Sequence, residues 1–310
     1  MYFLSHEERK YILRGLVPRA REVGVAEDLR GWNWHQPPLE PIFDVRLGVA
    51  EIANRYCDTG RDVFWRRVMG KRGRPSPPIL GGRYFHDVLV QVITRAKVLL
   101  YKGGVSGYRN ALKDLAEPLL PPLPSLPDGD DQADGWVQTL MDQGRELWEF
   151  EHQRISARVR EVLARQPYIH IDALVHQALP VVVEQRLDGT FLGLSPQLAT
   201  DALVLAEPVV MDLKFGDKRD FHRLSIAGYA LVMEALFEYP VNIGCISYAR
   251  YHQNRWLVER DAFIIDDELR QWFIEERDAK MRMVFDQIDP GLATGCVETC
   301  PYYSLCQNAE

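Results

Sequence analysis

The second half of the chain alternates short apolar runs with longer amphipathic runs. The short runs are rich in Val, Ile and Leu and are bounded by Gly, Pro, Asn or Asp, which predicts strands. We expect strands at 179–186, 202–205, 209–214, 241–248 and 256–264. Apolar residues at helical spacing predict helices at about 221–237 and 267–285. Strands crossed by helices indicate an α/β core.

The first half is dominated by helices and loops. Helical spacing is found within 5–30, over 46–69, near 83–100 and, after a break, over about 136–165. The break at 117–135, EPLLPPLPSLPDGDDQADG, is rich in Pro and then in Asp and Gly, so it is predicted as a surface linker. The predicted domains are a mainly helical N-terminal region at 1–135, a core at 136–290 and a C-terminal segment at 291–310.

The stretch 200–215, TDALVLAEPVVMDLKF, predicts a β-hairpin with its turn at 206–208. If the two strands pair symmetrically about this turn, Asp201 falls directly opposite Asp212. Lys214 then lies on the same face of the sheet as Asp212, because side chains alternate along a strand. The hairpin would therefore gather two carboxylates and one ammonium group.

Two facing carboxylates repel each other, and among Val, Met and Leu side chains they are poorly solvated. A divalent cation would compensate them, since Mg²⁺ and Mn²⁺ prefer carboxylate oxygens. The alternative is a solvated Asp-x-Lys ion pair on an exposed strand, worth about 0 to 1 kcal/mol. The apolar surroundings favour the metal site, because charged residues are rarely buried unless they are paired or bind an ion.

The composition indicates an ordinary globular protein. The 310 residues have room for a large core, and 46% of them are hydrophobic and 26% charged. No apolar run approaches the roughly 20 residues that span a bilayer, and the N-terminus, MYFLSHEERKYILRGL, has no signal-peptide pattern. We therefore expect a cytoplasmic protein that does not associate with membranes. The absence of a GxxxxGK[ST] sequence argues against an ATPase.

The charge gives little indication of a nucleic-acid partner. The net charge is −7, whereas nucleic-acid-binding domains are often basic. One segment, RDVFWRRVMGKRGR at 61–74, is strongly basic with a single acid. It is either a solvated helix end and loop or a patch that contacts phosphates.

Five cysteines are unevenly distributed. Cys296, Cys300 and Cys306 lie within eleven residues, and Cys57 is isolated far upstream. In an intracellular chain such a set indicates metal ligands and not disulfides. Zinc is one candidate, but the spacings differ from the usual paired knuckles and suit an iron–sulfur cluster at least as well. Cys245 falls in a predicted strand and is interpreted as a core residue.

These features together resemble a known group of nucleases. A lone N-terminal Cys, a helical His, an Asp, then Asp-x-Lys, a helical Tyr and a C-terminal Cys triplet are similar to RecB-like PD-(D/E)XK nucleases with an iron–sulfur cluster. The stretches YFLSHEERKYILRGL, DLRGWNWH and EIANRYCDTGRDV resemble the archaeal CRISPR-associated exonucleases of the Cas-four type, in their longer Csa variant. The resemblance covers nearly the whole chain. It implies a restriction-endonuclease-like core, a mixed sheet flanked by helices, with a Cys-ligated cluster joining the N- and C-terminal parts.

The resemblance also implies roles for individual residues. The expected ligands of one catalytic Mn²⁺ or Mg²⁺ ion are His86, Asp201, Asp212 and the backbone carbonyl of Leu213. Lys214 would polarise the attacking water and neutralise charge on the phosphate, and Tyr229 would contact DNA or the site. The expected cluster ligands are Cys57, Cys296, Cys300 and Cys306, with a 4Fe–4S cluster favoured over 2Fe–2S.

The chain departs from the family pattern at two positions, and one further acid is left open. Ser225 stands one helical turn before Tyr229, where related nucleases usually have Gln, so that contact is missing or is replaced by His222. A long segment precedes Asp201 instead of a tight Gly-x-x-Asp, which weakens its assignment. Glu184, on the preceding strand, either supports the metal or a second ion, or is a surface acid.

The function implied is a metal-dependent DNA exonuclease that acts on single-stranded ends in CRISPR spacer acquisition, with integrase subunits as partners. The alternative is an adaptor that binds DNA ends for the integration complex and has weak or vestigial nuclease activity. A zinc-stapled structural protein is a third hypothesis. The cluster is expected to be a structural staple, and a homo-oligomer is compatible with the sequence.

Overall fold

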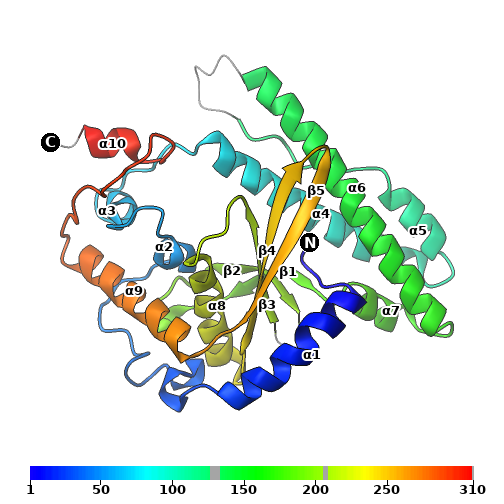
Figure 1. The fold of residues 1–310 in the computed structure, drawn as a ribbon, viewed down its shortest axis with the longest axis horizontal. Coiled ribbons are helices and arrows are strands. Elements are labelled where there is room, and N and C mark those ends of the chain that lie inside the picture. Colours follow the sequence, from blue (N-terminus) through cyan, green and yellow to red (C-terminus); the bar gives the residue numbers. More distant parts are fainter. Residues whose placement is uncertain (126–132, 205–208, 309–310) are drawn as a thin grey trace.

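The computed structural model describes residues 1–125, 133–204 and 209–308, and in this part of the chain it is a mixed α/β protein with one five-stranded sheet and ten α-helices (Figure 1). The strands are β1 Val182–Leu187, β2 Leu198–Val204, β3 Val209–Phe215, β4 Ile243–His252 and β5 Arg255–Ile264. All five lie where the apolar runs predicted them, with ends displaced by a few residues. Leu205 and the predicted turn at 206–208 lie outside the described residues.

The sheet has the strand order β1-β2-β3-β4-β5, and only β3 and β4 are parallel neighbours. Parallel neighbours need a crossover connection, which helix α8 (His222–Phe237) provides. The β2–β3 hairpin has the predicted register, because Ala202 pairs with Met211 and Val204 pairs with Val209. Continuing this register by one residue places Asp201 opposite Asp212.

Helices surround the sheet. The other α-helices are α1 His6–Val23, α2 Val49–Ala53, α3 Arg61–Arg67, α4 Pro77–Gly103, α5 Tyr108–Leu115, α6 Ala133–Arg165, α7 Ile171–Ala178, α9 Asp267–Phe285 and α10 Tyr303–Gln307. Three 3-10 helices are η1 Glu27–Leu29, η2 Gly31–Asn33 and η3 Thr190–Leu192. Helix α9 has the predicted bounds, and its first turn is capped by the Asp266 carboxylate, which accepts from the Leu269 N–H at 3.0 Å. Among the described helices, none is both long and apolar enough to cross a membrane.

The continuous helix predicted over 46–69 was wrong. Helix α2 ends at Ala53 and α3 begins only at Arg61, so Cys57 lies in the loop between them. The break has a physical cause, because Gly60 adopts a left-handed backbone with φ of 74°. In addition, Lys280 Nζ donates to three backbone carbonyls at and just after the end of α2, over 2.7–3.1 Å. The ammonium group of Lys280 thus satisfies carbonyls that N–H groups of a further helical turn would otherwise bond.

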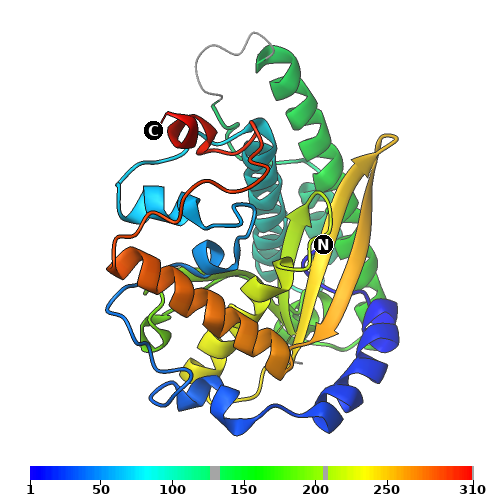
Figure 2. The ribbon, with the colours of Figure 1, turned by 60° about the vertical axis from the view of Figure 1, so that its left-hand side comes forward.

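Two hydrophobic cores cover the two faces of the sheet (Figures 1 and 2). Helices α4, α6 and α7 share one core with Ala202 and Met211, whereas α8, α9 and α2 share the other with Leu203 and Val210. Because side chains alternate along a strand, Asp201 and Asp212 lie on the face covered by α8. The N-terminal helices thus build a common core with the sheet.

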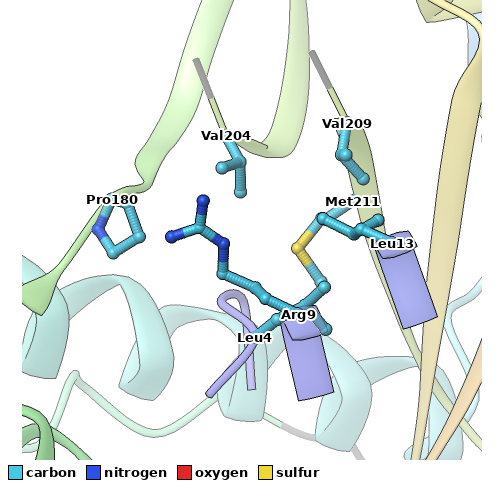
Figure 3. Close-up of a pocket in the computed structure, with 7 residues that line it drawn as sticks. All are labelled: Leu4, Arg9, Leu13, Pro180, Val204, Val209 and Met211. Atoms are coloured by element: carbon cyan, nitrogen blue, oxygen red, sulfur yellow. The ribbon is translucent and has the colours of Figure 1, made fainter. Parts of the chain in front are cut away.

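A small pocket lies where α1 and the N-terminal segment pack against the β2–β3 hairpin. Figure 3 shows the Arg9 side chain extending across it among apolar residues, which are Leu4, Leu13, Pro180, Val204, Val209 and Met211. Its volume of about 10 Å³ corresponds to about one water molecule. It is therefore a packing gap and not a substrate site.

Candidate active site

The β2–β3 hairpin holds two carboxylates side by side. The Leu213 N–H donates to Asp201 Oδ2 at 3.1 Å, which ties the β2 carboxylate to β3. The Asp212 side chain is buried, with an exposed fraction of 7%, whereas 27% of the Asp201 side chain is exposed. Asp201 is therefore the carboxylate of the pair that solvent reaches more readily.

Lys214 and Ser225 hold Asp212 in place. The Lys214 Nζ lies 2.8 Å from Asp212 Oδ2, and the Ser225 hydroxyl donates to the same oxygen at 2.7 Å. Burial opposes ionisation of Asp212, but Lys214 and these hydrogen bonds hold its pKa below the ordinary value. Burial likewise opposes the Lys214 charge, yet Asp212 and Asp201 raise the pKa of Lys214. The pair is an ionised contact inside the protein, unlike the solvated surface pair weighed from the sequence.

The pKa of Asp201 is shifted in the direction opposite to that of Asp212. Burial and then the charge of Asp212 raise the pKa of Asp201 to about 7, although His86 and Lys214 act to lower it. Its carboxylate is therefore incompletely neutralised by the side chains around it. A proton or a metal ion would supply the missing positive charge.

This shifted pKa leads to a prediction about stability. Because the folded pKa of Asp201 is about 7 and its ordinary value is 3.8, the residue contributes stability below about pH 4 that is lost as the pH rises through 7. Without divalent ions, we expect the wild-type protein to lose roughly 2 to 4 kcal/mol over this range relative to Asp201→Asn. Urea unfolding of both proteins, from pH 4.5 to 8, measures the difference. Added Mn²⁺ should restore the wild-type stability at the high end, and parallel pH profiles without metal would contradict the shift.

His86 from α4 and Glu184 from β1 complete the cluster. His86 Nε2 lies 2.5 Å from Glu184 Oε1, and His86 Nδ1 lies 3.9 Å from Asp201 Oδ2. Burial works against the imidazolium, but Glu184 and Asp201 raise the pKa of His86, while its hydrogen bond lowers the pKa of Glu184. One potential metal-ligating atom on each of His86, Glu184 and Asp201 lies within 4.8 Å of the other two, so the three side chains are close enough to share an ion.

Glu184 stands in register with the two aspartates. Its neighbours Val183 and Gln185 pair with Ala202 and Thr200, so Glu184 is opposite Asp201. Its backbone has a φ of 52°, a left-handed conformation that residues other than Gly rarely adopt. Three adjacent strands thus carry one carboxylate each, at neighbouring positions of the sheet. The structure places Glu184 within the cluster, a position that the sequence had left open.

Helix α8 supplies two further side chains. Tyr229 is half-buried, and burial followed by the charges of Asp201 and Asp212 raises the pKa of its phenol. Ser225, one helical turn before Tyr229, contributes its hydrogen bond to Asp212.

The His222 ring is hydrogen-bonded elsewhere. Its Nε2 lies 2.9 Å from the Tyr56 hydroxyl, and its Nδ1 lies 3.1 Å from the Tyr248 hydroxyl. Burial, followed by the charge of Lys214, lowers the pKa of His222 to about 4, so the ring is neutral near pH 7.

Sequence reasoning missed Tyr2. Its hydroxyl forms a short hydrogen bond with His86 Nδ1, and its side chain is fully buried. Burial, followed by the charges of Asp201 and Asp212, raises the pKa of Tyr2, which keeps the phenol protonated. No local pattern indicated this role, because Tyr2 and His86 are 84 positions apart.

A second centre gathers the four predicted cysteine ligands. Burial raises the pKa of the Cys300 thiol, and three neighbouring thiols raise it further, namely those of Cys296, Cys57 and Cys306. The Trp65 indole N–H donates to Cys306 Sγ at 3.2 Å, and Figures 1 and 2 show α10 beside α3. Cys245 is a buried core residue in β4, as predicted.

Side-chain bonds hold the Cys57 loop against the C-terminal segment. Thr59 donates to the Gly291 carbonyl at 3.0 Å, and Arg61 makes two hydrogen bonds of 2.7 and 2.8 Å with Asp289. Farther along the chain, the Arg74 N–H donates to the Pro301 carbonyl at 2.9 Å. The four thiols therefore belong to two segments that are joined by direct hydrogen bonds.

The basic segment at 61–74 divides into two groups. Arg66 and Arg67 form ion pairs with Glu51, and Arg61 pairs with Asp289, so these three arginines have structural partners. Arg66 and Arg67 are exposed, as are Lys71, Arg72 and Arg74, but the last three form no ion pair within the described part of the chain. Their charges are therefore the least neutralised in the segment and the most readily offered to phosphates.

The fold and these two centres define an α/β protein with a histidine–carboxylate cluster at its sheet and a separate group of four thiols. A family model described as CRISPR-associated exonuclease Csa1 matches residues 1–309, and the chain belongs to this family. The resemblance to Csa-type exonucleases is thereby confirmed, and membership supports a CRISPR-linked nuclease.

Two relatives carry the same description. A Thermoproteus tenax protein named CRISPR-associated exonuclease Csa1 is 29% identical over 285 residues, which cover 92% of each chain. A Saccharolobus solfataricus protein of the same name is 30% identical over 98% of this chain and 99% of its own.

Proposed function

We propose that this protein is a metal-dependent exonuclease that hydrolyses phosphodiester bonds at single-stranded DNA ends during CRISPR spacer acquisition. The observation that carries the proposal is the pairing of Asp201 with Asp212 inside the hairpin, where the pKa of Asp201 is raised to about 7. A carboxylate in this state is poised to exchange a proton for a metal ion. The family to which the chain belongs supports exonuclease chemistry.

The donor set suits a hard divalent cation. Carboxylate oxygens favour Mn²⁺ or Mg²⁺, and an imidazole nitrogen is a common additional ligand. The residues that would hold the ion are His86, Asp201, Asp212 and the Leu213 carbonyl, with Glu184 beside them. Once bound, the ion would lower the pKa of a water molecule and polarise the phosphoryl oxygen.

The side chains around this position have separate tasks. The Lys214 ammonium is one-third exposed, so it can meet a phosphate while it stays beside Asp212. Its charge would stabilise the negative charge that develops on the phosphoryl oxygens. Ser225 keeps Asp212 oriented. Because its pKa is raised, the Tyr229 phenol stays protonated and would donate a hydrogen bond to the DNA backbone.

The thiol centre is proposed to hold a 4Fe–4S cluster through Cys57, Cys296, Cys300 and Cys306. Burial and then the neighbouring thiols raise the pKa of Cys300 and of Cys306, the thiols because closely spaced thiolates repel each other. A bound cationic centre would offset this repulsion and favour the thiolate form. We propose a structural role, in which the cluster joins the Cys57 loop to the C-terminal segment.

This proposal predicts different outcomes for two cysteine substitutions. Cys300→Ala should abolish iron binding and the brown colour, and should lower the melting temperature, because one ligand of four is lost. Cys245→Ala is the matched control, since this thiol lies in the β4 core. Iron and sulfide analysis of anaerobically purified proteins measures the difference. Zinc in the wild-type protein, or full iron content in the Cys300 variant, would contradict the cluster assignment.

The nuclease proposal is tested with end-labelled single-stranded DNA. Progressive shortening with Mn²⁺ or Mg²⁺, and none after chelation, is the expected result. A stable complex with full-length DNA would instead support an adaptor that holds ends for CRISPR integrase subunits. An inactive protein that binds no DNA would overturn both functions.

A further inference from the structure

Tyr56 is an exposed aromatic residue in the loop between α2 and α3, immediately before Cys57. Its exposed fraction is 68%, although large aromatic side chains are usually buried for the most part. Exposure alone has no functional meaning, because single apolar residues are common on protein surfaces. What distinguishes Tyr56 is its position and the way in which it is held.

The ring lies at the edge of the candidate active site. His222, which bonds the Tyr56 hydroxyl, also accepts through its carbonyl from the Ser225 hydroxyl at 2.9 Å, and Ser225 in turn donates to Asp212. Arg219, an exposed residue in the segment between β3 and α8, accepts through its backbone carbonyl from the His222 N–H at 3.1 Å, so it lies next to the histidine that bonds Tyr56. The charges that act on the Tyr56 hydroxyl are those of two cations, Lys214 and Arg219, and of one exposed acid, Asp217, and Lys214 also contacts the Asp212 carboxylate.

The Tyr56 side chain is held on two sides. Its hydroxyl is 2.9 Å from His222 Nε2, and its ring packs edge-on against Phe221, with centroids 5.0 Å apart and an interplanar angle of 88°. His222 is itself held by the Tyr248 hydroxyl, and Lys280 anchors the start of the loop. A ring held in this way would lose little conformational entropy when a ligand stacks on it.

An exposed aromatic ring beside cations is the arrangement by which proteins bind single-stranded nucleic acid without reading its sequence. The ring stacks on a base, and the cations contact the neighbouring phosphates. A base inside a duplex is already stacked on both faces and is not available to such a ring. We propose that Tyr56 stacks on one unpaired nucleobase of the DNA strand, with Arg219 contacting its phosphate, and so positions the strand at the active site.

This inference rests on the proposed nuclease function and names a feature of its substrate. The competing explanation is structural, because the Tyr56 hydroxyl also satisfies a nitrogen of the buried His222. Two substitutions separate the explanations. Tyr56→Phe keeps the ring and removes the hydroxyl, whereas Tyr56→Leu removes both. Tyr168→Leu is the matched control, since Tyr168 is 96% exposed in the connection between α6 and α7.

The test measures binding separately from cleavage. Each substitution is combined with Asp212→Ala, and fluorescence anisotropy gives the affinity for a labelled oligodeoxythymidylate. We expect Tyr56→Leu to weaken binding by about 5- to 150-fold, the range of stacking on one aromatic ring, while the Phe and Tyr168 variants bind like the parent. Equal weakening by Phe and Leu would show that the hydroxyl bridge to His222 is what matters, and would overturn the proposal.

A second set of oligonucleotides, each with one abasic position, identifies the stacked base. One position should reduce binding by the protein that retains Tyr56, and the same position should have no effect on Tyr56→Leu. If the wild-type protein shortens DNA but Tyr56→Leu binds as tightly as the parent, the stacking inference fails and the nuclease function stands. If the wild-type protein neither binds nor shortens DNA, the nuclease function fails and the inference fails with it.

Discussion

Asp212→Ala is expected to abolish DNA cleavage with Mn²⁺ or Mg²⁺ while the protein stays folded and keeps its iron. The carboxylate is the shared partner of Lys214 and Ser225 and faces Asp201, so its loss removes a proposed metal ligand and leaves Lys214 without its anchor. The fold should survive, because the repulsion that raises the pKa of Asp201 is also removed. End-labelled DNA digests and circular dichroism measure the two properties.

Lys214→Ala should have a smaller effect than Asp212→Ala. Loss of one group that stabilises transition-state charge lowers rates by about 10²- to 10³-fold. Asp142→Ala, which changes an exposed carboxylate on α6 paired with Arg145, is the control and should leave cleavage unchanged. Undiminished cleavage by both site variants would reject the assignment of this cluster as the active site.

Glu234→Ala is expected to destabilise the protein by about 3–5 kcal/mol, because it breaks a fully buried ionic network. The carboxylate accepts from Arg30 at 2.8 Å, from Arg270 at 2.7 and 2.9 Å, and from the backbone N–H groups of Gly31 and Val241. Arg270 is fully buried, so its charge would lose its carboxylate partner without gaining water. Urea unfolding of the wild type and the variant measures the loss.

Glu275→Ala provides the matched comparison for this substitution. Glu275 lies on the exposed side of α9, where among the described residues it accepts only from Gln271. Its removal should change stability by less than about 0.5 kcal/mol. A similarly small effect of Glu234→Ala would show that the network has little energetic value. The network also bears on the active site, because Glu234 anchors α8, the helix that carries Ser225 and Tyr229.

The sequence determined the elements whose signals are local. Apolar periodicity located the five strands and gave the bounds of α9, because a periodic pattern of a few turns or pleats depends only on neighbouring residues. The hairpin register could also be predicted, since strands joined by a short turn pair symmetrically about it. That symmetry was sufficient to place Asp201 opposite Asp212 without knowledge of the fold. The strand order of the sheet and its division into two cores did not follow from these patterns.

Beyond the members that the family resemblance implied, tertiary structure decided which distant side chains join the local ones. Glu184 meets His86 across 98 positions, and Tyr2 meets the same histidine across 84, so no window of sequence contains either contact. The helix predicted over 46–69 was wrong for a related reason. The Lys280 ammonium of α9 binds the carbonyls where α2 ends, and the apolar periodicity of a segment contains no information about a partner so far along the chain. Local patterns specify elements, whereas a site assembled from five elements depends on how packing and burial bring them together.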